Sequence, residues 1–193
     1  MQGLMMDFPL TITSIMEHAE RVHGAQEIVS VTRDNPRHRY TYADSFARVR
    51  QLANAMNAWG LAQSDRIATL AWNDYRHFET YYASACAGYV CHTINPRLFP
   101  EQIVYIINHA EDQYVFLDPD FWPLIEQVAP QCTGVKGWVV MTTAEHMPET
   151  AVSNVHCYED LLAGQASTYE WPAIDENDAC ALCYTSGTTG NPK

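Results

Sequence analysis

The chain has 193 residues, of which 47% are hydrophobic and 18% are charged. This balance is typical of a folded protein of one or two domains and excludes an intrinsically disordered chain. Residues 1–10 carry no positive charge and no stretch reaches the roughly 18 apolar residues of a membrane helix, so we predict neither a secretory signal nor a transmembrane segment.

The net charge of −12 is concentrated in the second half of the chain. Up to Leu98, nine Arg balance nine Asp and Glu, whereas the residues from Phe99 on carry two Lys against fourteen Asp and Glu. An acidic half argues against a nucleic-acid partner. Two interpretations remain: a solvated acidic surface, or a surface that meets positively charged residues in a longer chain.

The six cysteines show no disulfide framework, and a cytoplasmic protein is the simplest interpretation. Cys180 and Cys183 have C-x-x-C spacing, but no second pair lies at zinc spacing. We therefore expect all six to be buried thiols.

Helical and strand-like patterns alternate along the chain. Apolar residues from Ile12 to Val22 repeat at helical spacing, and Thr41 with Asp44 three residues later indicates the capped start of another helix. Residues 142–154 are polar and irregular, and are a candidate domain boundary. The expected helices are 12–23, 42–59, 75–87, 100–110, 119–128 and 158–163, and the expected strands are 27–32, a short one ending at Tyr40, 67–72, 89–94, 114–117, 138–141 and 179–184.

This alternation predicts an α/β fold with a layered, largely parallel sheet flanked by helices. Ligands of such sheets bind beyond the carboxyl ends of the strands. Residues 72–73 and 95–97 follow two predicted strands, but their Asn and Pro favour a role in turns over a pocket wall. The aromatic side chains of Phe78, Tyr81 and Tyr82 are predicted to be core, and His77, His92 and His109 lack any evident catalytic partner.

The last ten residues are the most informative part of the chain. Four hydroxyl residues and two glycines precede Lys193, and such segments hydrogen-bond phosphate oxygens through backbone N–H groups and hydroxyls. The Walker pattern does not fit, because Gly187 and Gly190 are three apart and the lysine follows three later. The dinucleotide fingerprint does not fit either, because Pro192 stands where its helix would begin.

The segment 185–193, Thr-Ser-Gly-Thr-Thr-Gly-Asn-Pro-Lys, resembles the signature of the adenylate-forming superfamily, which includes acyl-CoA synthetases, luciferases and peptide-synthetase adenylation domains. Residues 92–103, His-Thr-Ile-Asn-Pro-Arg-Leu-Phe-Pro-Glu-Gln-Ile, resemble the opening part of these enzymes. Residues 108–112, Asn-His-Ala-Glu-Asp, and residues 183–184, Cys-Tyr, resemble the fatty-acyl-CoA ligase branch. Medium-chain fatty-acid ligases look most similar, with ligases for short sulfur-containing acids such as 3-methylthiopropionate nearly as similar. The resemblance covers the whole chain but only about the first third of a typical member.

The resemblance implies that residues 1–193 are an incomplete, N-terminal part of the AMP-binding large domain, with the rest of that domain and a small C-terminal domain lying elsewhere. It implies that the protein binds a carboxylic acid, ATP, Mg²⁺ and coenzyme A, and that the Mg²⁺ lies near Thr185. It assigns no catalytic residue to this stretch. It assigns the ATP phosphates to Thr185, Ser186, Gly187, Thr188, Thr189, Gly190 and Lys193.

We therefore expect a fragment of an AMP-forming acid–thiol ligase that is inactive alone. The alternative from another class is a non-catalytic binding or dimerisation module, because related long-chain enzymes form homodimers through this region. Acyl-chain length is not evident from these residues.

Overall fold

The computed structural model describes residues 3–4, 8–185 and 192–193. Six parallel strands form the central sheet in the order β7-β6-β5-β3-β4-β8, and a separate antiparallel ribbon pairs β1 with β2. The α/β class with a parallel sheet flanked by helices is confirmed. The strands are β1 Glu27–Ser30, β2 His38–Thr41, β3 Arg66–Leu70, β4 Val90–Thr93, β5 Asp112–Leu117, β6 Gly137–Val140, β7 Val155–Cys157 and β8 Ala181–Cys183.

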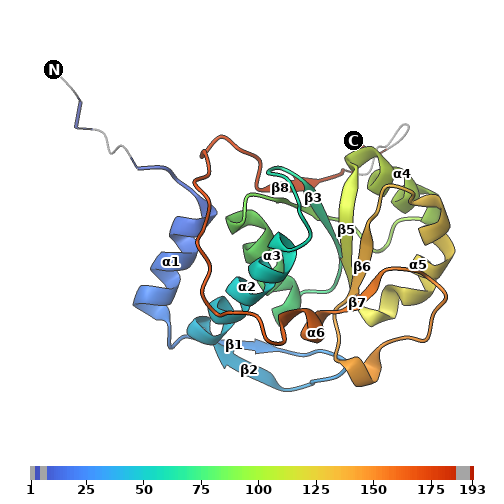
Figure 1. Cartoon of the computed structure of the whole chain (residues 1–193), viewed down its shortest axis with the longest axis horizontal. Coiled ribbons are helices and arrows are strands. Elements are labelled where there is room, and N and C mark those ends of the chain that lie inside the picture. Colours follow the sequence, from blue (N-terminus) through green and yellow to red (C-terminus); the bar gives the residue numbers. More distant parts are fainter. Residues whose placement is uncertain (1–2, 5–7, 186–191) are drawn as a thin grey trace.

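Helices cover both faces of the sheet, giving three layers (Figure 1). On one face, α1, α2, α3 and α6 enclose a core around Met16, Phe46 and Phe116. On the other face, α4 and α5 enclose a second core around Ile103, Ile125 and Leu117. The α-helices are α1 Ile12–His23, α2 Tyr42–Asn57, α3 Tyr75–Cys86, α4 Pro100–Ala110, α5 Trp122–Val128 and α6 Tyr158–Leu162.

Local sequence signals explain where several helices begin. The Thr41 side chain accepts from the Asp44 N–H at 3.2 Å while the Asp44 carboxylate accepts from the Thr41 N–H at 3.0 Å, which completes the predicted capping box. Asp74 caps α3 by accepting from the His77 N–H at 2.9 Å.

The expected helix 119–128 ends at Val128 and begins with Asp118 at the N-cap position, but the Asp118 side chain makes no capping hydrogen bond and the first turn is not α-helical. A 3₁₀ turn, Pro119–Phe121, precedes α5, and one carboxylate oxygen of Asp118 instead accepts from the Trp72 N–H at 2.5 Å. The carboxylate therefore joins the ends of β3 and β5.

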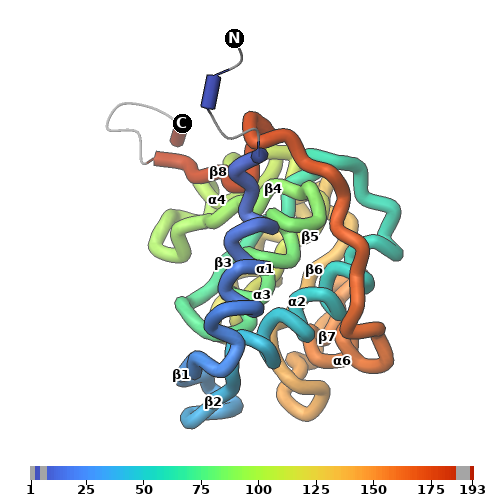
Figure 2. The backbone as a smooth tube through the Cα atoms, turned by 90° about the vertical axis from the view of Figure 1, so that its left-hand side faces the viewer, coloured from blue at the N-terminus to red at the C-terminus, as the bar shows by residue number. Residues whose placement is uncertain are grey.

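The connector 163–180 links α6, at one side of the sheet, to β8 at the other. It runs along the helical layer formed by α1 and α2 (Figures 1 and 2). The Asn54 side chain of α2 donates to the carbonyls of Ala166 and Thr168, both at 2.9 Å. These bonds fix the path that brings β8 beside β4.

Candidate functional site

The candidate phosphate-binding segment leaves the sheet at the carboxyl end of β8. Cys91, His92 and Thr93 of β4 lie in parallel register with Ala181, Leu182 and Cys183 of β8. The segment therefore begins at the sheet edge where parallel α/β folds bind ligands.

The two ends of this segment are hydrogen-bonded to each other. The Thr185 N–H donates to the Lys193 carbonyl at 2.8 Å, and the Lys193 N–H donates to the Thr185 carbonyl at 3.2 Å. The Thr185 hydroxyl also donates to the Lys193 carbonyl, at 3.1 Å. We call the Thr185–Lys193 pair the stem, because it closes the segment into a loop.

The predicted phosphate-binding residues divide into two groups. Thr185 and Lys193 are brought together and both are exposed. The other predicted residues lie outside the described part of the chain, so their contacts with phosphate stay predictions. These are Ser186, Gly187, Thr188, Thr189 and Gly190.

A cavity of about 610 Å³ lies at the carboxyl ends of β3, β5 and β6, away from the stem. Its lining includes Trp72, Asp74, Asp118 and Asp120. Burial raises the pKa of Asp118 to about 7, and the charges of Asp74 and Asp120 act in the same direction. Arg33 and Arg76 also line the cavity, so side chains of both charges face it.

The loops after β3 and β4 differ in their roles. The Asn95 side-chain oxygen accepts from the Arg97 N–H at 3.0 Å, and the Trp72 indole N–H donates to Asp120 at 3.3 Å. Turn chemistry was the favoured interpretation of residues 72–73 and 95–97, and the local Asn95 bond agrees with it for 95–97. For Trp72 that preference is wrong, because its side chain lines the cavity and bonds Asp120, 48 residues away.

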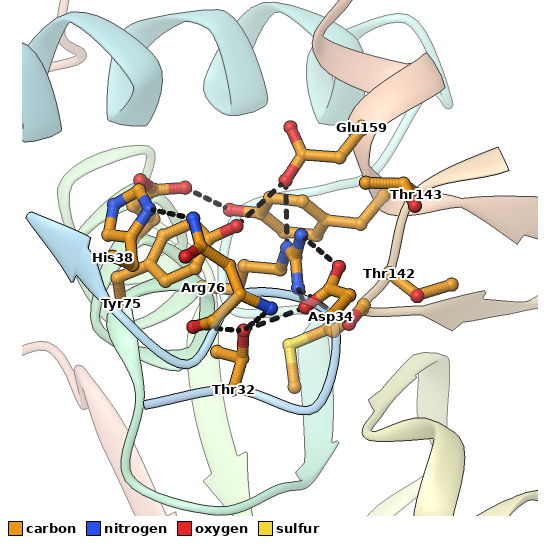
Figure 3. Close-up of polar contacts among 12 residues, drawn as sticks. Thr32, Asp34, His38, Tyr75, Arg76, Thr142, Thr143 and Glu159 are labelled. Carbon is orange, nitrogen blue, oxygen red and sulfur yellow. Dashed lines mark hydrogen bonds and ion pairs between the residues drawn. The ribbon is translucent and has the colours of Figure 1, made fainter. Parts of the chain in front are cut away.

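A buried ionic network joins α3 to the turn after β1 and to α6 (Figure 3). The Arg76 guanidinium, 2% exposed, donates to Asp34 at 2.8 and 3.1 Å and to Glu159 at 2.7 Å. Burial alone would raise the pKa of Asp34, but its bonds to Arg76 and Thr32 outweigh burial and lower that pKa to about 2.

Arg48 of α2 extends the network into the core. Its guanidinium donates to Glu79 at 2.7 Å and to Glu159 at 3.0 and 3.2 Å. Glu79 is fully buried and also accepts from the hydroxyls of Tyr40 and Tyr158, at 3.0 and 2.7 Å. Each charge thus has an opposite partner within the described chain, which indicates a structural role in holding α2, α3 and α6 together.

The histidines were predicted to have no catalytic partner, and the structure adds one pairing that the sequence did not reveal. His92 Nδ1 lies 2.9 Å from both carboxylate oxygens of Asp112, and both side chains are fully buried. His77 is hydrogen-bonded to Thr69 and the Trp72 carbonyl, each at 3.0 Å. Nothing in the sequence signalled the His92–Asp112 pair, because the expected strand 114–117 begins two residues after Asp112, whereas β5 begins at Asp112 itself.

Two predictions about side-chain burial are wrong. Cys180 and Cys183 are exposed, because β8 is an outer strand, whereas Cys86, Cys91, Cys132 and Cys157 are buried as expected. Tyr81 is 37% exposed, while Phe78 and Tyr82 pack against the first core.

Two features are absent from the described residues. No cluster of three His, Cys, Asp or Glu side chains suited to a metal ion occurs among them. None of their helices combines the length and apolar character required to cross a bilayer.

Residues 16–193 match the AMP-binding enzyme family. The chain belongs to that family. It is 48% identical over 193 residues to a 3-methylmercaptopropionyl-CoA ligase of Ruegeria lacuscaerulensis and 49% identical over 193 residues to a medium-chain-fatty-acid–CoA ligase of Ectopseudomonas oleovorans. The matches cover 100% of this chain but 36% and 35% of those relatives, so the chain spans about a third of their length.

Solved structures support the fold. An anthranilate CoA ligase in complex with anthranoyl-AMP superimposes with a TM-score of 0.81 at 20% identity, over 97% of this chain and 34% of that one. The N-terminal domain of FACL13 from Mycobacterium tuberculosis gives 0.77 at 24% identity, over 95% of this chain and 43% of that one. The sheet and its flanking helices are therefore those of adenylate-forming enzymes.

Proposed function

We propose that residues 1–193 form the N-terminal part of the large domain of an AMP-forming acyl-CoA ligase. The observation that carries this proposal is the stem, because its hydrogen bonds turn a Gly- and Thr-rich segment into a closed loop at the carboxyl edge of a parallel sheet. The family match and the similarity to CoA ligases support the same reaction.

In the proposed reaction, a carboxylate oxygen attacks the α-phosphorus of ATP, the bond to the bridging oxygen breaks, and pyrophosphate leaves. The CoA thiolate then attacks the acyl carbon and AMP leaves. The first step joins an anion to a polyanion, so the protein must position both and neutralise charge. We assign the β- and γ-phosphates to the N–H groups of residues 187–190 and to the hydroxyls of Ser186, Thr188 and Thr189.

The ends of the loop complete this assignment. Lys193 is exposed beside Thr185 and would neutralise the departing pyrophosphate. The Thr185 hydroxyl gives its hydrogen to a carbonyl, so its lone pairs suit an oxygen-preferring cation such as Mg²⁺. When bound, Mg²⁺ would neutralise charge on the phosphates. We assign no residue of this chain to CoA.

We propose a medium-chain fatty acid as the carboxylic acid. A short sulfur-containing acid is the second candidate, and the nearly equal identities of 49% and 48% favour keeping it. We expect residues 1–193 alone to be inactive, because no catalytic residue is assigned within them. A homodimer and a cytoplasmic location stay predictions.

Pyrophosphate release by the longer protein that contains residues 1–193 tests this function. The assay supplies MgATP with octanoate, hexadecanoate or 3-methylthiopropionate. We expect release with octanoate, and a loss of at least about 100-fold in Gly187→Val, because the bulky residue displaces the loop backbone. Gly134→Val is the matched control, because a Cβ atom at Gly134 meets nothing within 4 Å. Absence of release with every acid would refute the proposal.

A further inference from the structure

The strand that delivers the phosphate-binding loop is weakly held by its own contacts. β8 has three residues in register with β4, and within the described chain it pairs with no other strand. The side chains of Ala181 and Cys183 are exposed and that of Leu182 is half-buried. Such an edge strand has little packing to fix its direction. Something beyond the strand must therefore hold the loop in place.

Tyr184, between β8 and the stem, supplies that fixation. Its hydroxyl lies 2.6 Å from Nδ1 of His109 in α4. Its ring packs against the second core, with its centroid 5.2 Å from that of His92 and 5.8 Å from that of His109. A single side chain thus connects the base of the loop to both α4 and β4.

The His92 ring that faces Tyr184 is itself fixed. Its Nδ1 lies 2.9 Å from both oxygens of Asp112, at the start of β5, and both side chains have zero exposure. Among the described residues, Nε2 of His92 has no hydrogen-bond partner, so Asp112 alone sets the orientation of the ring. Tyr184 therefore rests on a ring that cannot turn without breaking a buried hydrogen bond.

We propose that Tyr184 is a positioning residue, which sets the place of the phosphate-binding loop through its hydrogen bond to His109 and its contact with the His92–Asp112 pair. This inference rests on the proposed function. The stem begins at the next residue, so a shift of Tyr184 moves Thr185 and, through their paired backbones, Lys193. Phosphate-binding groups must stand within roughly 0.5 Å of their productive positions, so a small shift lowers the rate of adenylation.

Conservative variants separate positioning from simple packing. Tyr184→Phe keeps the ring and removes only the hydroxyl, and His109→Phe keeps an aromatic ring but removes Nδ1. Tyr105→Phe is the matched control, because Tyr105 lies on α4 with its ring 5.2 Å from that of His109 and its hydroxyl makes no hydrogen bond to the rest of the described chain.

The measurement is ATP–pyrophosphate exchange by the longer protein, with MgATP and octanoate varied separately. We expect Tyr184→Phe and His109→Phe each to lower kcat/KM for MgATP about three- to tenfold, the value of one hydrogen bond. KM for octanoate should stay within about twofold. The double variant should match either single variant, because both lose the same contact.

Three results would decide against the inference while the wild type remains active. In the first, Tyr184→Phe has the same kcat/KM for MgATP as Tyr105→Phe. In the second, the losses of kcat/KM in the two single variants multiply in the double variant. In the third, Tyr184→Phe and His109→Phe both have a lower melting temperature but unchanged kinetics. A wild type without ATP-dependent exchange would instead overturn the proposed function, so the two failures are distinguishable.

Discussion

Replacing Glu79 by Gln is the sharpest test of the buried ionic network. Glu79 has zero exposure and accepts from Arg48 at 2.7 Å and from Tyr158 and Tyr40 at 2.7 and 3.0 Å. Removing one partner of a buried ion pair costs about 3–5 kcal/mol, because the other charge stays buried. Arg48 keeps Glu159 as a partner, so we expect about 3 kcal/mol, or roughly 10 °C in melting temperature.

Urea unfolding of residues 1–193, followed by tryptophan fluorescence, measures this free energy. The matched control is Glu27→Gln, which breaks an exposed pair with Arg39 in which the side chains are 49% and 59% exposed. Such a pair contributes at most about 1 kcal/mol. If the two variants unfolded with free energies within about 1 kcal/mol of each other, the reasoning about burial would be refuted.

Three further predictions concern other parts of the fold. Burial raises the pKa of Asp118 to about 7, above its ordinary value near 4, so its ionisation destabilises the fold as pH rises between these values. Between pH 5 and pH 8, the free energy of unfolding in urea should therefore fall by about 2–3 kcal/mol less in Asp118→Asn than in the wild type. An equal fall in both proteins would contradict this. Gly137→Ala should destabilise by about 1–3 kcal/mol in the same assay, because its Cβ atom would lie 2.8 Å from Tyr114; wild-type stability would show that the site relaxes freely. A thiol reagent should modify Cys180 and Cys183 in the native chain and all six cysteines after denaturation, and rapid reaction of a third native thiol would be inconsistent with the burial described.

The sequence predicted the helices and strands of the fold well, because apolar spacing and capping depend on residues close together in the chain. Apolar spacing placed α2 and α4 within a residue or two, and the capping box at Thr41 is set by residues three apart. The alternation of strands and helices was enough to predict a parallel sheet.

The ionic network could not be predicted, because its partners are distant in the chain. Arg48 lies 31 residues from Glu79 and 111 from Glu159. Only the packing of α2, α3 and α6 brings them together. Asp118 shows the same limit, since its carboxylate bonds the Trp72 N–H, 46 residues away, instead of the adjacent helix.

The candidate site was predicted from its residue types, and the structure adds the hydrogen bonds of the stem. The motif named Thr185 and Lys193, but their mutual hydrogen bonds follow from backbone geometry that residue types do not encode. The exposure of Cys180 and Cys183 was missed for a related reason. An apolar run predicts a strand without telling whether that strand lies at the centre or the border of its sheet.

The order of strands in the sheet has a consequence for how the protein matures. Cys91 of β4 pairs with Ala181, about 90 residues later, whereas each of the other neighbouring strands is joined by a much shorter stretch of chain. Closing so long a segment carries a larger entropic cost, so we predict that β8 docks after the other five strands have assembled. We therefore expect the amides of β8 to exchange before those of the other five strands of the sheet in native-state hydrogen exchange.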